Sequence, residues 1–280
     1  MKFVDDISLA QSLNMKECVV TNPDPNPVLP LQYHDRTGHI LPTSQCALQV
    51  QLNTLADYCK TYNMVINTGK TKVMMFNPSR IYDGTPKLTL PDMGSDYLEL
   101  VESFKLLGVI IRSDMKWCDN TDYICQKGYS RLWMLRRLKG LGATVKELLD
   151  VYQKQVRSVL EMAVPVWHPA ITQHETKQVE RIQKCALYII LGSSYTCYND
   201  ALELLEIDSL QKRRSKICEK FAKNCLKSPR YSTWFQFNQF TQSTHNTRSE
   251  KMKFKAVSTR TQRYKNSSIP YLTELLNKKM

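Results

Sequence analysis

The sequence lacks the long apolar segments of membrane and secreted proteins. No stretch reaches the ~18 apolar residues that a membrane-spanning helix needs. The first residues, Met1 to Asp6, have no long apolar segment behind a positively charged start, as a signal peptide would. Paired cysteines are also missing, because the nine cysteines are scattered and none forms a C-x-x-C pair. We therefore predict a soluble, intracellular protein with reduced thiols and no membrane partner, in either nucleus or cytoplasm.

Several common enzyme signatures are absent as well. The chain has no nucleophile elbow, no Walker loop and no dinucleotide-binding fingerprint. Its five histidines do not combine with cysteines at the spacing of a zinc site. Hydrophobic residues make up 42% of the sequence and charged residues 23%, which is ordinary for globular proteins. At ~150 residues per domain, the 280 residues predict about two domains.

Basic charge is segregated along the chain. The formal net charge is +13, but residues 1–100 carry 8 basic and 10 acidic side chains, whereas residues 101–280 carry 31 and 16. The last 88 residues alone carry 17 basic and 7 acidic side chains. Such a region favours polyanions, because each neutralised phosphate releases condensed counterions. A soluble, merely solvated basic surface fits the same numbers.

The first part of the chain predicts helix mixed with short strands. Five prolines between residues 21 and 42 predict a loop. Apolar residues from Leu48 to Tyr62, at steps of four and three, predict a helix that begins near Ser44. Short strands are predicted at 64–66 and 71–76, joined into a hairpin by a turn at 67–70, and at 87–90, 97–101 and 106–111.

From about residue 119 the apolar period is helical. One helix ends at Gly140 and Gly142, and two capping boxes, Thr144 with Glu147 and Thr172 with Glu175, begin two more. Later helices are predicted up to Gly192, near Asn199, from 210 to 225 and after Pro270.

The tryptophans allow two interpretations. Exposed tryptophans stack on unpaired bases. Trp133 and Trp167 lie within helical apolar patterns, which favours core positions for both.

Two adjacent carboxylates, Asp5 and Asp6, follow a short apolar segment. Carboxylates on a tight turn suit Mg²⁺, which binds one or two of them together with substrate phosphates. In two-metal phosphoryl transfer such ions activate the attacking oxygen and stabilise the leaving one. Taken alone, an Asp pair in a turn is more often a local cap or Asx-turn.

In their order along the chain, the motifs resemble non-LTR (LINE/jockey-like) retrotransposon reverse transcriptases. Phe3-Val4-Asp5-Asp6 resembles their catalytic hairpin, and residues 67–76, with Lys70, resemble the lysine-bearing segment that follows it. Residues 104–111, with Leu107-Gly108 at their centre, are similar to the primer-grip hairpin. Similarity to the helical thumb and the region beyond it covers residues 152–167, 179–186, 210–214 and 261–271.

The resemblance implies an α+β fold: a truncated palm of antiparallel sheet plus helix, then an all-helical thumb and a basic C-terminal extension. The corresponding domains are 1–115, 116–192 and 193–280. The implied reaction is templated DNA synthesis on RNA, with an RNA template, a DNA primer and Mg²⁺. The sequence does not indicate an oligomeric state.

The same resemblance assigns roles to single residues. Asp5 and Asp6 would be catalytic metal ligands, and Lys70 would sit near the nucleotide's phosphates. Leu107 and Gly108 would position the primer strand. From the residues alone, a solvated turn lysine and a strand with a tight bend fit equally well.

Two basic clusters are candidate nucleic-acid contacts. They are Arg131, Arg136, Arg137 and Lys139 near the end of one helix, and Lys212, Arg213 and Arg214 at the start of a later one. Phosphate contact is the functional interpretation. A helix C-terminus that attracts cations through its dipole, and a solvated helix face, are the alternatives.

The aspartate pair stands at position 5, whereas family members carry a further metal-binding aspartate and the nucleotide-checking segment upstream of it. We therefore expect weak Mg²⁺ binding and no polymerisation by this chain alone. The alternative function is a non-catalytic nucleic-acid-binding remnant that contacts phosphates. A third hypothesis is an unselected reading frame that is barely stable.

Overall fold

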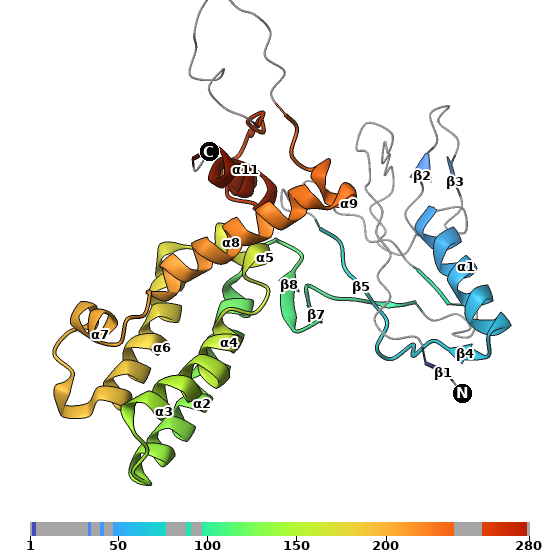
Figure 1. The fold of residues 1–280 in the computed structure, drawn as a ribbon. Helices are drawn as coiled ribbons and strands as arrows, with labels where there is room; N and C mark the ends of the chain where they lie inside the picture. Colours follow the sequence, from blue (N-terminus) through green and yellow to red (C-terminus); the bar gives the residue numbers. More distant parts are fainter. Residues whose placement is uncertain are drawn as a thin grey trace, which may run out of the picture. The chain divides into compact units, whose positions relative to one another are not determined.

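The computed structural model describes residues 2–3, 33–34, 40–41, 47–76, 88–90, 97–237 and 254–278. Two compact units divide the chain, Met1–Met115 and Lys116–Met280. Helices and two-stranded sheets both occur, so the fold is α+β (Figure 1). The predicted division has a boundary at the same place, after residue 115. Its second boundary, after residue 192, lies inside the second unit, where helices from both sides of it pack together.

Short strands and one longer helix form the described part of the first unit. The helix is α1 (Ala47–Thr61), as the apolar period predicted. The strands are β1 (Lys2–Phe3), β2 (Tyr33–His34), β3 (Ile40–Leu41), β4 (Met64–Val65), β5 (Lys72–Val73), β6 (Glu99–Leu100), β7 (Ser103–Leu106) and β8 (Val109–Arg112).

Strand pairing differs from the predicted hairpin at residues 64–76. β4 pairs with β1 in parallel, and β5 pairs with β6 in parallel, so β4 and β5 are not partners of each other. The turn between them is present, because Asn67 O accepts hydrogen bonds from the backbone N–H groups of Lys70 and Thr71 at 3.1 and 3.0 Å. The two antiparallel pairs are β2–β3 and β7–β8.

A small apolar core lies against α1 in this unit. It contains Leu52, Val73, Leu88, Leu90 and Leu98. The buried side chain of Gln49 fixes the segment 88–90, because its amide donates to Thr89 O at 2.8 Å and accepts from Thr89 N at 3.0 Å.

The second unit is helical in its described part. Its longer helices are α2 (Cys118–Gly140), α6 (Gln173–Leu191), α8 (Leu210–Lys227) and α11 (Ser268–Lys278). Its shorter elements are α3 (Val145–Val151), η3 (Tyr152–Arg157), α4 (Ser158–Leu160), α5 (Val164–Trp167), η4 (His168–Ala170), η5 (Gly192–Ser194), α7 (Tyr198–Leu204), α9 (Pro229–Ser232) and α10 (Gln262–Lys265).

The predicted helix starts are confirmed at two places. Thr144 and Thr172 each accept from the backbone N–H three residues later, and Glu147 and Glu175 each bond back to the cap, which completes both capping boxes. Gly192 follows α6 with a φ of +59°, the left-handed region that glycine occupies without strain.

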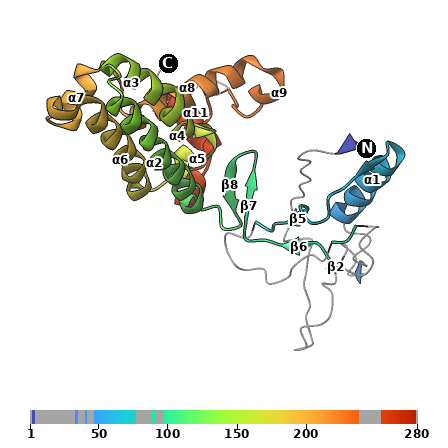
Figure 2. The same cartoon turned by 90° about the horizontal axis from the view of Figure 1, so that it is seen from below.

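α2 and α6 lie side by side and run in the same direction (Figures 1 and 2). A Cβ on Gly128 of α2 would come within 3.1 Å of Ile182 in α6 and within 2.9 Å of Leu160 in α4. Eleven residues further on, the Lys139 ammonium donates to the carbonyl of Ile189, near the end of α6. The helices therefore advance together, and glycine permits their close approach.

The core of the helical unit lies among α2, η3, α4, α5, α6 and α8. Fully buried side chains include Leu135, Tyr152, Val156, Leu160, Trp167 and Ile182. Trp167 is thus in the core, as predicted, and its indole N–H donates to Met162 O at 2.8 Å. None of the helices in the described ranges has the length and apolar content needed to span a lipid bilayer.

Candidate nucleic-acid interface

Of the three residues predicted to be catalytic, the structure describes one. Asp5 and Asp6 lie outside the described residues. Lys70 is exposed at the end of the turn that Asn67 closes, and its backbone N–H also bonds the Asn67 side chain at 3.1 Å. The turn hydrogen bonds thus involve the Lys70 backbone, and its side chain is exposed to solvent. In the described part of the chain, no three His, Cys, Asp or Glu side chains come together in a way that could hold a metal ion.

Leu107 and Gly108 form the tip of the hairpin β7–β8. Leu106 pairs with Val109, so the loop has two residues, and both have positive φ, +48° and +87°. This is the two-residue loop whose twist matches that of paired strands. A leucine in the left-handed region costs about 1 kcal/mol, which glycine avoids. The leucine side chain is 76% exposed, so the hairpin presents an apolar tip to solvent.

The basic cluster of α2 is divided between structural and solvent-facing side chains. Arg131 donates to the carbonyl of Gln155, and Lys139 donates to that of Ile189. These two cations satisfy carbonyl groups of neighbouring helices. Arg136 and Arg137 are exposed, and the structure gives their guanidinium groups no partner among the described residues. The predicted phosphate contacts of α2 thus remain open to a ligand at two positions of four.

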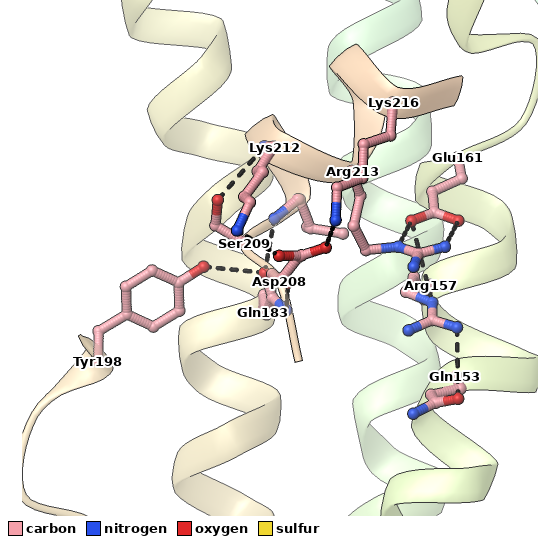
Figure 3. Close-up of polar contacts among 11 residues, drawn as sticks. Gln153, Arg157, Glu161, Gln183, Tyr198, Asp208, Ser209, Lys212, Arg213 and Lys216 are labelled. Atoms are coloured by element: carbon pink, nitrogen blue, oxygen red, sulfur yellow. Dashed lines mark hydrogen bonds and ion pairs between the residues drawn. The ribbon is translucent and has the colours of Figure 1, made fainter. Parts of the chain in front are cut away.

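At the start of α8 the basic side chains are held in an ionic network (Figure 3). Lys212 pairs with Asp208 at 2.8 Å, and Lys216 pairs with the same carboxylate. Their hydrogen bonds lower the pKa of Asp208 to about 2. Arg213 binds Glu161 of the α4–α5 turn through both carboxylate oxygens, one of them at 3.0 Å. A phosphate would therefore compete with these carboxylates.

Gln183 of α6 joins this network to the rest of the unit (Figure 3). Its carbonyl oxygen accepts from the Leu210 backbone N–H at 2.9 Å and from the Tyr198 hydroxyl at 2.8 Å. Its amide nitrogen donates to Asp208 O at 3.1 Å. One buried side chain thus fixes the entry of α8 and positions the carboxylate that Lys212 and Lys216 share.

Arg214 does not lie where its predicted role needs it. Its side chain is 0% exposed, so it cannot contact a phosphate in solvent. The guanidinium lies 5.9 Å from the centre of the Trp167 ring, and its Nε–H donates to His168 Nδ1 at 3.3 Å. Burial and this neighbouring cation lower the pKa of His168 to about 4, so the imidazole is neutral and accepts at pH 7. α8 directs Arg214 inward because it lies four residues after Leu210, on the buried face of the helix.

Trp133 also departs from its predicted place. It is 64% exposed, whereas its neighbours Leu132 and Leu135 are buried. Each helical residue turns by about 100°, so Trp133 lies on the side of α2 away from those two leucines. Reading the helix angle residue by residue, rather than the apolar content of the segment, would have predicted this exposure.

A second exposed aromatic side chain was not anticipated from the sequence. Tyr188 in α6 is 62% exposed, and its ring meets that of Tyr195 edge-on at 5.5 Å. It ends the exposed row Lys177, Arg181, Lys184 and Tyr188, whose steps of four, three and four follow one side of the helix.

Comparisons with protein-family models, with curated proteins and with solved structures gave no match.

Proposed function

We propose that this chain is part of an RNA-directed DNA polymerase of a non-LTR retrotransposon, in which the unit 116–280 binds the template and primer. The observation that carries the proposal is the charge of that unit. It contains 29 Lys and Arg against 14 Asp and Glu, a net charge of +15, whereas residues 1–115 carry 10 against 12. A polyanion is the partner that such a unit attracts most strongly.

The order of elements supports the same proposal. A hairpin with Leu107-Gly108 at its tip, the segment that resembles the primer grip, directly precedes the helical unit. An apolar, exposed tip with close backbone approach suits contact with a nucleic-acid strand. Asp5 and Asp6 would bind Mg²⁺. The primer 3′ hydroxyl would lose its proton and attack the α-phosphate of a deoxynucleoside triphosphate, the bond between the α- and β-phosphates would break, and pyrophosphate would leave.

A non-catalytic role in nucleic-acid binding is the second candidate function. Exposed cations of the helical unit, such as Arg136 and Arg137, favour this alternative. They can bind phosphates without any contribution from a catalytic residue. Under this alternative the aspartate pair contributes nothing to the affinity for nucleic acid.

Binding of the full chain to a labelled DNA primer on an RNA template tests the proposal. Fluorescence anisotropy should give an affinity that falls about a hundredfold between about 50 and 200 mM salt if about four phosphates are contacted. An affinity that does not change with salt would contradict both candidate functions.

Primer extension with deoxynucleotides and Mg²⁺ tests the aspartate pair directly, and we expect no polymerisation by this chain alone. Extension that is lost in Asp5→Ala assigns catalysis to the aspartate pair. Absence of extension is expected under both candidate functions, so binding compares them. Equal affinity for nucleic acid, with Mg²⁺ present, in the parent chain, Asp5→Ala and Asp6→Ala favours the non-catalytic alternative.

A further inference from the structure

The outer sides of α2 and α6 carry aromatic and cationic side chains together. We define the α2–α6 face by six exposed residues: Tyr129, Trp133, Arg136 and Arg137 of α2, with Arg181 and Tyr188 of α6. Trp133 and Tyr188 are among the most exposed large side chains in the described part of the chain. Neither is needed to complete the core, because Leu132, Leu135 and Leu187 fill the buried positions beside them.

The parallel packing of the two helices places these side chains on one surface. Gly128 and Ile182 mark the same level of the two helices. With a rise of 1.5 Å per residue, Trp133 lies about 7.5 Å beyond that level and Tyr188 about 9 Å beyond it. Tyr129 lies on the side of α2 next to α6. Burial and Cys185 of α6 raise the pKa of the Tyr129 hydroxyl, and the Arg181 guanidinium of α6 lowers it. Trp133 and Tyr188 therefore project from neighbouring helices at similar heights.

Basic side chains outnumber acidic ones around these rings. From Gln126 to the end of α2 there are five Lys or Arg and no acidic residue. From Lys177 to the end of α6 there are three Lys or Arg and one acid, Glu180. The carboxylate of Glu180 shares the single Tyr198 hydroxyl proton with Gln183, at 2.8 Å, on the side of α6 that faces α7. Trp133 and Tyr188 thus lie in helix segments where guanidinium and ammonium groups outnumber carboxylates.

Flat rings beside guanidinium groups match the chemistry of an unpaired nucleic-acid strand. Every base has a π-face that stacks on an aromatic side chain, and the phosphates between bases bind Arg. In a duplex each base face is covered by the neighbouring bases. Such a surface can therefore bind the phosphates of a duplex but cannot stack on its bases. The rings therefore distinguish single strands from duplexes, and the arginines do not.

We propose that the α2–α6 face binds single-stranded nucleic acid, with unpaired bases stacked on Trp133 and Tyr188. Arg136, Arg137 and Arg181 hold the adjoining phosphates. This rests on the proposed function only in taking nucleic acid as the ligand, since stacking needs neither the aspartate pair nor Mg²⁺. The face would thus hold an unpaired region of template or primer.

The test uses the full chain, a labelled 20-nucleotide DNA strand of thymidines and a duplex of the same length. Trp133→Ala should weaken single-strand binding about tenfold, because one stacked base is lost, and leave duplex binding within about twofold. Trp133→Phe should restore most of the single-strand affinity, because it returns an aromatic ring to the site.

Trp234→Ala is the matched control. Trp234 is also an exposed tryptophan of the helical unit, but it follows α9 in the chain and does not belong to the α2–α6 face. The control should bind both strands as the parent chain does. Unchanged thermal unfolding of Trp133→Ala shows that the helices are intact, as expected for a ring that contributes little to the core.

Three results would overturn the inference. They are single-strand affinity that Trp133→Ala leaves unchanged, equal losses for single strand and duplex, and displacement of the strand by polyglutamate at equal charge concentration. If duplex binding persists when one of these results is found, only the further inference is rejected and the proposed function is not. If the parent chain binds neither the single strand nor the duplex, both are rejected.

Discussion

The two units of this chain have similar numbers of acidic residues but differ in basic charge and in the burial of their cores. Residues 1–115 carry 12 acidic and 10 basic side chains, and residues 116–280 carry 14 and 29. In the described part of the first unit the strands are two to four residues long, and none of the core side chains is completely buried. The second unit has a helix of 23 residues and many side chains with no exposed surface. Among the described residues, the unit with the larger core is therefore also the unit with the excess of basic side chains.

The largest expected effect is on the core of the helical unit. Leu160→Ala removes a completely buried side chain that contacts the Gly128 position, and it should lower the free energy of unfolding of this unit by about 4 kcal/mol. Urea unfolding followed by tryptophan fluorescence reports on this unit alone, because all four tryptophans lie beyond residue 115.

Leu90→Ala is the matched change in the first unit, where Leu90 is 3% exposed. We expect it to leave the midpoint of the tryptophan transition unchanged. Equal shifts for the two variants would mean that the units unfold together, and the contrast between them would not hold.

Acid should weaken the helical unit through His168. Its pKa is about 4 in the folded chain, against 6.5 for an ordinary histidine, because burial and Arg214 disfavour the imidazolium. The unfolded chain therefore takes up a proton first. Stability is complete above about pH 6.5 and falls by at most about 3 kcal/mol as the pH approaches 4.

Urea unfolding at a series of pH values measures this loss. His168→Asn keeps a side-chain acceptor for Arg214 but does not titrate, so its stability should change less over the same range. Parallel curves for the two proteins would show that His168 does not cause the acid sensitivity.

A smaller effect is expected from the glycine between α2 and α6. Gly128→Ala gains helix propensity but places its Cβ 2.9 Å from Leu160 and 3.1 Å from Ile182, so we expect a net loss of about 1–2 kcal/mol. Gly140→Ala, at the end of the same helix, meets nothing within 4 Å and should be neutral or slightly stabilising. Thermal unfolding followed by circular dichroism compares them. A Gly128→Ala protein as stable as Gly140→Ala would mean that the neighbours move aside without cost.

The sequence predicts local features of this fold well. Both capping boxes, the end of α6 at Gly192 and the extent of α1 depend on residues within a few positions of each other, so pattern and spacing identify them. Strand partners are another matter. β4 and β5 are close in sequence, yet β4 pairs with residues 2–3 and β5 with residues 99–100, and no local signal specifies partners at that separation.

The candidate interface was predicted in part for the same reason. The exposure of Arg136 and Arg137 follows from the period of α2. Other helices supply the carbonyl that binds Arg131 and the carboxylate that binds Arg213, and they bury Arg214. A cluster of basic residues in the sequence does not identify such partners. The prediction of a core position for Trp133 was wrong because its apolar residue type was given more weight than its angle around the helix.

The attachment of α7 has a consequence for how the unit opens. Of its seven residues, only Ala201 is buried, and the Tyr198 hydroxyl connects it to Glu180 and Gln183 of α6. A helix held by a few polar contacts opens at a lower free energy than the elements whose apolar faces are enclosed. Amide protons of α7 should therefore exchange with deuterium through local opening, whereas those of α6 should exchange only when the whole unit unfolds.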